Sequence, residues 1–275
     1  MPASTSPDHR LVAARARPPL PLLVPGLLAL GFLVLPLLGL ALRAPWRRLP
    51  DLLTSAQVLD ALRLSLMCAL LATLLSLLLG VPLAWLLART DFPGRRIVRA
   101  LVTVPLVLPP VVGGVALLML LGRRGVVGQY LDAWFGLSLP FTTAAVVLAE
   151  AFVAMPFLVI AVEGALQATD SRYETAAATL GASRWMVFWR VTLPMAAPGV
   201  VAGSVLCFAR ALGEFGATIT FAGSFPGVTR TMPIEVYLRL QSDPDTAIVL
   251  SLLLLAVSVL VLAMLRDRWT RSGLT

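Results

Sequence analysis

Lysine is absent from this 275-residue chain, so its 22 permanently cationic side chains are all arginines. A phosphate-binding loop of the G-x-x-x-x-G-K-[ST] type requires a lysine, and any ATP chemistry linked to this chain must therefore reside on another polypeptide. Charged residues are scarce as well, at 13% of the chain against about 25% in a soluble domain. Together with 59% hydrophobic residues, this composition predicts a protein that crosses a membrane several times.

Ligands for a metal ion and groups for covalent catalysis are also lacking. His9 is the only histidine and lies in an N-terminal segment of Pro, Ser and Arg residues, while Cys68 and Cys207 each lie inside an apolar run. Zinc sites use three or four His, Cys or carboxylate ligands, and cysteines in apolar runs are typically small buried side chains. We therefore expect no metal, no cofactor and no catalytic residue, which argues against an intramembrane enzyme.

Six apolar runs are each long enough to cross a bilayer as a helix, which takes about 20 residues. The first run is too long for the core of a secretion signal, which has about 7–15 residues. We expect an all-α polytopic membrane protein with six transmembrane helices between a disordered tail, residues 1–17, and a C-terminal tail, residues 266–275. The expected spans are residues 18–42, 64–88, 100–122, 141–162, 198–221 and 246–265.

The third span contains residues that do not fit a regular helix. Pro105, Pro109 and Pro110 each lack a backbone N–H, and Gly113 and Gly114 follow directly. Prolines inside a helix remove hydrogen bonds and kink it. Irregular backbone at membrane depth is tolerated only where it packs in protein or lines a watery cavity. The sequence therefore predicts a broken third span in one of these two settings.

A polar segment, residues 171–194, separates the fourth span from the fifth and should form two short helices. Ser171 and Glu174 fit a capping box, which predicts that a helix begins at the residue after the serine. Gly181 lies where a helix commonly ends in a left-handed residue. A second helix with large apolar side chains should follow and should end at Pro194, which lacks an N–H.

The distribution of arginines predicts the orientation of the chain. The two termini, the loop after the second span and the segment 171–194 together hold 13 arginines, whereas the loops at the opposite side hold 7. Cytoplasmic loops carry the excess of positive residues in membrane proteins. We therefore expect both termini and the segment 171–194 in the cytoplasm, and we expect no nucleic acid partner.

Three ionisable side chains, Glu150, Arg210 and Glu214, lie within the expected spans. A charge at the centre of a transmembrane helix costs about 2.5–3.5 kcal/mol, so such groups pair with one another or face an aqueous path. Arg210 and Glu214 are four residues apart and should lie on one face of a helix. Two interpretations stay open: an ion pair that only locks helices together, or a translocation path at a subunit interface. The candidate path consists of Glu150, Ser204, Arg210, Glu214, Thr218 and Thr220.

Within the polar segment, two alanines, a glycine four residues later and then a Val-x-Leu-Pro sequence resemble the cytoplasmic EAA loop of bacterial ABC importer permeases. Thr175 replaces the acid expected at the first position of this motif, and Glu174 lies one residue earlier. The resemblance implies a type I importer permease fold and a coupling helix that docks on a separate ATPase. The coupling residues that it implies are Tyr173, Glu174, Thr175, Ala176, Ala177, Gly181, Val191, Leu193 and Pro194. On the local pattern alone, an ordinary interfacial helix pair is the alternative.

Three further runs, LVLPPVVGG, FTTAAVVLAEAFVAMPFLV and ARALGEFGATITFAGS, resemble the permease subunits of molybdate importers and, less closely, those of sulfate importers. The resemblance implies ATP-driven import of molybdate, or of tungstate or sulfate, by alternating access in a bacterial plasma membrane. The implied partners are a second copy of the permease, two ATP-binding subunits and an extracytoplasmic oxyanion-binding protein.

An ion- or proton-coupled secondary transporter is the alternative function. Glu150 and Glu214 would then carry protons or ions through the membrane. No pair of matching half-sequences of the inverted-repeat kind is visible in the chain. This favours the importer permease.

Overall fold

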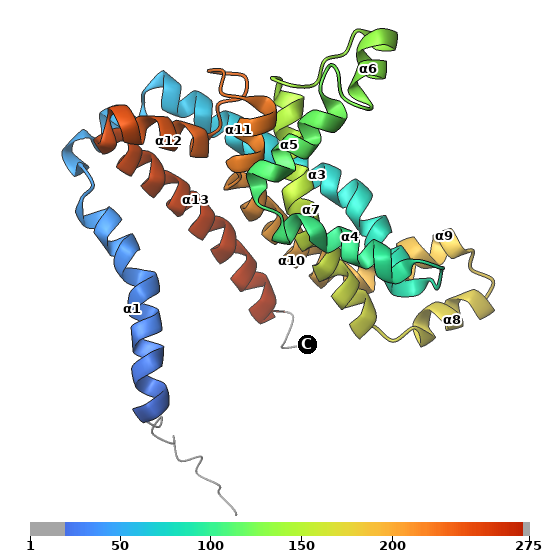
Figure 1. The fold of residues 1–275 in the computed structure, drawn as a ribbon. Coiled ribbons are helices and arrows are strands. Elements are labelled where there is room, and N and C mark those ends of the chain that lie inside the picture. Colours follow the sequence, from blue (N-terminus) through green and yellow to red (C-terminus); the bar gives the residue numbers. More distant parts are fainter. Residues whose placement is uncertain (1–19, 272–275) are drawn as a thin grey trace, which may run out of the picture. The chain divides into compact units, whose positions relative to one another are not determined.

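The computed structural model describes residues 20–271, and every regular element in that range is a helix (Figure 1). The predicted all-α class is confirmed. The α-helices are α1 (Leu20–Leu42), α2 (Leu49–Leu53), α3 (Ala56–Arg89), α4 (Arg95–Val107), α5 (Pro110–Leu121), α6 (Gly128–Phe135), α7 (Thr143–Ala168), α8 (Arg172–Thr179), α9 (Arg184–Val187), α10 (Leu193–Leu212), α11 (Gly216–Ala222), α12 (Met232–Ser242) and α13 (Pro244–Arg271). A 3-10 turn at Trp46–Arg48 and a π-helical turn at Phe188–Thr192 complete the set.

The chain divides into two compact units, of which the first ends at Ala44 and the second begins at Pro45. In the first unit, α1 is apolar and long enough to cross a membrane, although it contains Pro25 and Pro36. The tail predicted at residues 1–17 lies outside the described residues.

The centre of the second unit is formed by α3, α7 and α10, which pack on one another. The contacting faces are rich in small side chains, and Ala84, Ala154 and Ala211 are fully buried there. A Cβ atom on Gly203 of α10 would lie 3.0 Å from the Cβ atom of Ala161 in α7. Small residues allow membrane helices to approach closely, which increases van der Waals contact where lipid offers no hydrophobic driving force.

The break predicted in the third span is present between α4 and α5, whose axes are bent by 117°. Pro110 begins α5, a position where its missing N–H leaves no partner unsatisfied. Pro109 and Pro110 are exposed on this single chain, so the chain itself does not enclose the break. The glycines that follow serve close packing: a Cβ atom on Gly114 would lie only 2.7 Å from the carbonyl oxygen of Ala217 in α11.

The predicted fifth span, residues 198–221, does not coincide with one helix. An apolar helical stretch runs from Arg184 to Leu212 through the π-helical turn, so Pro194 does not end the second helix of the polar segment. Pro194 lies in the first turn of α10, where a proline is tolerated. At the other end the chain turns at Gly213, and α11 is a separate short helix. The last predicted span, residues 246–265, lies within α13, which continues to Arg271.

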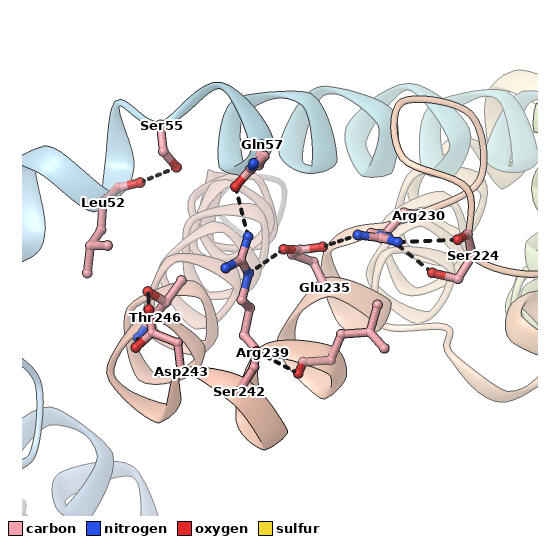
Figure 2. A network of polar contacts seen from close by, with 11 residues as sticks. Leu52, Ser55, Gln57, Ser224, Arg230, Glu235, Arg239, Ser242, Asp243 and Thr246 are labelled. Atoms are coloured by element: carbon pink, nitrogen blue, oxygen red, sulfur yellow. Dashed lines mark hydrogen bonds and ion pairs between the residues drawn. The ribbon is translucent and has the colours of Figure 1, made fainter.

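Ionic hydrogen bonds fix α12 at the end of the second unit opposite to α8 and α9 (Figures 1 and 2). Buried Glu235 accepts from Arg239 Nε at 2.7 Å and from Arg230 Nη1 at 3.5 Å. Arg239 also donates through Nη2 to the side-chain oxygen of Gln57 at 2.8 Å, and Arg230 Nε donates to the hydroxyl of Ser224 at 3.1 Å. The network joins α12 to the first turn of α3 and to the loop after α11.

Candidate functional site

The polar segment forms the two short helices α8 and α9, which lie beyond the ends of α7 and α10 (Figure 1). At the end of α8 the N–H of Ala182 donates to the carbonyl of Ala177 at 3.1 Å, and the N–H of Gly181 donates to the carbonyl of Ala178 at 3.0 Å. This is the hydrogen-bond pattern of a Schellman motif. Gly181 has φ +88°, as predicted for this position, and the turn sets the direction in which α9 leaves α8.

The predicted capping box at the start of α8 is wrong. The helix does begin at Arg172, but the side chain of Ser171 makes no capping hydrogen bond. The N–H of Arg172 instead donates to Oδ1 of Asp170 at 2.9 Å. The nearby Asp170 takes the acceptor role expected of the serine, which leaves the Glu174 carboxylate available for partners outside the helix.

Glu174 joins α8 to two of the long helices. Its Oε1 atom accepts from Nε of Arg89, the last residue of α3, and from the hydroxyl of Thr192, directly before α10, both at 3.0 Å. Arg89 also donates through Nη2 to the carbonyl of Thr169 at 3.2 Å. The side chains of Arg89 and Glu174 are only 13% and 18% exposed, so water screens their attraction less than that of a surface pair. We call Arg89, Glu174 and Thr192 the clamp.

The opposite face of the segment is exposed and partly apolar. Leu180 is 89% exposed, and the aromatic side chains of Tyr173 and Trp185 are largely exposed as well. Thr175 and Ala176 of the motif lie on this exposed side of α8. Exposed apolar side chains gathered on one segment mark a contact surface, so this face is the candidate docking surface for a partner.

The remaining predicted coupling residues lie closer to the long helices. Ala177, Val191 and Leu193 are partly buried, and Pro194 is exposed in the first turn of α10. The π-helical turn that contains Val191 leads without interruption into α10. The second half of the motif therefore forms the junction between the polar segment and α10.

The predicted ion pair in the membrane is present, although Arg210 and Glu214 do not share one helix. Nη1 of Arg210, in the last turn of α10, lies 2.7 Å from Oε2 of Glu214, which follows the helix end at Gly213. The other oxygen of Glu214, Oε1, accepts the N–H of Ala217 at 2.8 Å. Glu214 therefore links the end of α10 to the start of α11, in the manner of a side chain that caps a helix.

The other residues of the candidate path come from α7, α10 and α11, and α7 contacts both of the other helices. Glu150 of α7 is buried, and its Oε2 atom has no hydrogen-bond partner among the described residues; the same holds for the buried hydroxyl of Thr218. The hydroxyls of Ser204 and Thr220 donate to carbonyls one turn earlier in their own helices, at 2.6 and 2.7 Å. Arg210 is the one basic residue among the six candidate path residues, and its side chain is 28% exposed.

Several residues that form these contacts could not be identified from the sequence. Arg89 and Thr192 of the clamp gave no local signal, because their partner is distant in the chain. Glu163 did give one, since it directly follows the fourth expected span. It pairs with Arg99 of α4, whose Nε lies 3.0 Å from Oε1 of Glu163, and it accepts from Gln167 at 3.0 Å.

Comparison with known proteins identifies the family. The model of the family described as "binding-protein-dependent transport system inner membrane component" matches residues 80–272. The chain belongs to this family. It is a multi-pass membrane permease of a transport system, and its relatives are transport subunits rather than enzymes.

Two relatives of the permease are named for the transport of molybdenum and of sulfate. The molybdenum transport system permease protein ModB of Mycobacterium bovis is 53% identical over 238 residues, which cover 86% of this chain and 90% of that protein. The sulfate transport system permease protein CysT of Escherichia coli K12 is 36% identical over 245 residues, 88% of each chain. The resemblance to molybdate and sulfate permeases is confirmed.

A solved importer shares the fold of the permease. The bacterial alginate ABC transporter, in complex with an alginate pentasaccharide-bound periplasmic protein, matches with a TM-score of 0.73 at 20% identity. The match covers 92% of this chain and 94% of that chain. At this identity the likeness concerns the fold alone, and it confirms the predicted architecture of an importer permease.

Proposed function

We propose that this permease is the membrane-spanning subunit of an ATP-driven importer for molybdate, or for a related oxyanion such as tungstate or sulfate. The identity to a molybdenum permease and to a sulfate permease supports this class of cargo. The proposed partners are a second copy of the permease, two ATP-binding subunits and an extracytoplasmic oxyanion-binding protein. The periplasmic protein in the alginate importer complex supports the last of these partners.

The observation that supports the proposal most directly is the construction of the polar segment, residues 171–194, which we now call the coupling segment. Its exposed face carries Tyr173, Leu180 and Trp185, which suit docking on another subunit. Its inner face is tied through the clamp to α3 and α10. A partner that displaces α8 therefore acts on two long helices through short, partly buried polar contacts.

In the proposed cycle, ATP binding brings the two ATPase subunits together, and the two docked α8 helices follow them. The clamp passes this displacement to α3 and α10, which both pack on α7. Because α7 carries Glu150 and α10 carries Arg210, the movement reaches the candidate path. The permease pair then opens outward to accept the anion, and hydrolysis returns it to the inward-facing state.

The charges along the candidate path suit weak binding of an anion. Arg210 supplies hydrogen-bond donors and a positive charge, whereas Glu150 and Glu214 oppose the approach of an oxyanion. Selection of the anion would then occur mainly on the separate binding protein. We place the permease in a bacterial plasma membrane with both termini and α8 in the cytoplasm, in agreement with the distribution of arginines.

Reconstitution in liposomes tests this function. The permease is combined with the ATP-binding subunit and the oxyanion-binding protein of the same organism, and molybdate uptake is measured with and without ATP on the ATPase side. Uptake should require ATP and all three components, and competition by tungstate and sulfate should rank the anions. Uptake by the permease alone, driven by a proton gradient, would overturn the proposal in favour of a secondary transporter.

A further inference from the structure

An apolar groove with a volume of about 770 Å³ lies beside the coupling segment. One wall is α3, and the other is the helical stretch from α9 into α10. Aliphatic side chains line most of it, and the aromatic residues in the lining are Trp85, Trp185, Phe188 and Trp189. Arg184 is the one charged residue in the lining. A groove of this composition suits a ligand that is apolar along its length and anionic at one end.

The direction of the groove follows from contacts between its walls. The ring centroids of Trp85 in α3 and of Phe188 are 6.0 Å apart. Both residues lie one turn from the clamp, which joins the last residue of α3 to the residue directly before α10. The two walls are therefore antiparallel, and Leu74 and Val200 line the end remote from the coupling segment. Arg184, the first residue of α9, lies at the coupling end.

The length of the groove corresponds to one leaflet of a bilayer. Its lining on α3 runs from Leu74 to Leu86, which at 1.5 Å per residue is about 18 Å. The hydrocarbon core of a bilayer is about 30 Å thick, so one leaflet is about 15 Å. An acyl chain whose headgroup lies level with Arg184 would thus follow the groove toward the centre of the membrane.

We propose that the groove binds a phospholipid with an anionic headgroup, from the leaflet that faces the coupling segment. Arg184 is exposed and makes no ion pair with any described residue, so its charge is available to a headgroup. The hydroxyl of Ser183 caps α9 by accepting the N–H of Met186 at 3.2 Å, which fixes the position of Arg184. Tryptophans favour the membrane–water interface, and basic pockets between membrane helices bind anionic headgroups.

A lipid in this groove would contact α3 and α9 together. Both elements adjoin the clamp, and Trp185 belongs to the exposed face of the coupling segment as well. The bound lipid would thus hold the coupling segment at a defined position on the bundle. This inference concerns lipid binding alone and does not depend on the transported anion or on ATP.

Quenching of tryptophan fluorescence by brominated lipids tests the inference on the full-length permease in vesicles. Brominated phosphatidylglycerol should quench more strongly than brominated phosphatidylcholine at equal content, since three of the six tryptophans line the groove. Arg184→Gln should lower the apparent affinity for phosphatidylglycerol about fivefold, as one interfacial arginine does. Arg190→Gln is the matched control, because Arg190 is an exposed arginine nearby that does not line the groove.

Three results would overturn the inference. Equal quenching by the two lipids, or equal effects of the two arginine variants, would mean only a general attraction between the basic surface and the membrane. A second copy of this chain could instead cover the groove. Leu78 is exposed in the groove, and the native Cys68 and Cys207 are buried. Efficient disulfide formation between copies of Leu78→Cys in membranes would assign the groove to a dimer interface, whereas the lipid site predicts none.

Discussion

The position of Glu174 in the sequence determines which residues its carboxylate contacts. It lies one residue before the position at which the importer motif has its acid, and it turns toward the long helices rather than toward a partner. There its Oε1 atom accepts from Arg89 and Thr192. An ion pair that is largely removed from water tolerates the loss of one partner poorly, because the remaining charge keeps its desolvation cost. The clamp therefore should be sensitive to changes at either end.

We predict that Arg89→Gln reduces ATP-dependent uptake strongly while the protein still inserts into the membrane. A hydrogen bond to a charged group contributes about 1.5–3 kcal/mol, and its loss would let α8 move without displacing α3. The ATPase activity of the assembled complex should persist, so the measured ratio of anion imported to ATP hydrolysed should fall.

The control for the clamp is Arg96→Gln, which removes an exposed arginine from the first turn of the next helix, α4. It should leave the ratio unchanged. The exchanged pair Arg89→Glu with Glu174→Arg should recover part of the coupling if the attraction between the two groups matters. Full coupling in Arg89→Gln would show that the clamp does not transmit motion.

The partners of these residues could not be read from local sequence. Arg89 and Glu174 are 85 positions apart, and only the packing of α3 on α7 brings them together. The capping box failed for a related reason: Asp170 was available to the first N–H group of α8, and the clamp attracted the carboxylate of Glu174. A short polar motif therefore identified the segment without identifying the bonds of its side chains.

Substitutions of Gly181, in the turn between α8 and α9, should reduce uptake to different degrees. A Cβ atom there would meet no other atom within 4 Å, so Gly181→Ala carries only the conformational cost of φ +88°, about 1–2 kcal/mol. Proline cannot adopt this φ and would also remove the hydrogen bond to the carbonyl of Ala178. We expect Gly181→Ala to reduce uptake moderately and Gly181→Pro to abolish it, with normal membrane insertion of both. Normal molybdate uptake by the proline variant would contradict the coupling role.

The lengths of the apolar runs predicted the long helices, because a helix that spans a bilayer needs an uninterrupted run of apolar side chains. Their ends were less predictable, since they depend on tertiary contacts. Gly213 ends α10 where Glu214 can bond both Arg210 and the N–H of Ala217. Pro194, a usual stop signal, instead lies in the first turn of α10, directly after a π-helical turn. Proline and glycine thus marked irregular points correctly without revealing the kind of irregularity.

At the scale of the whole molecule, the orientation in the membrane can be measured with single introduced cysteines. The two native cysteines are buried and should not react with a membrane-impermeant thiol reagent. Leu180→Cys, on the coupling segment, should be labelled only from the cytoplasmic side. Val126→Cys, exposed between α5 and α6 at the other end of the unit, should be labelled only from outside (Figure 1).

Addition of the ATP-binding subunit should protect Leu180→Cys from labelling and leave Val126→Cys unaffected, because docking covers only the coupling segment. Labelling of Leu180→Cys from the outer side would reverse the proposed orientation and remove the docking role of α8.

The contact of Gly114 with Ala217 limits how the molecule can change shape. Because the backbones of α5 and α11 touch there, neither helix can slide along or rotate against the other without a steric clash. We expect the two to be displaced as one rigid body, with rotation confined to the non-helical residues that flank them, Leu108 and Pro109 on one side and Gly213 on the other. Outward opening would then be a hinge motion rather than a shear motion.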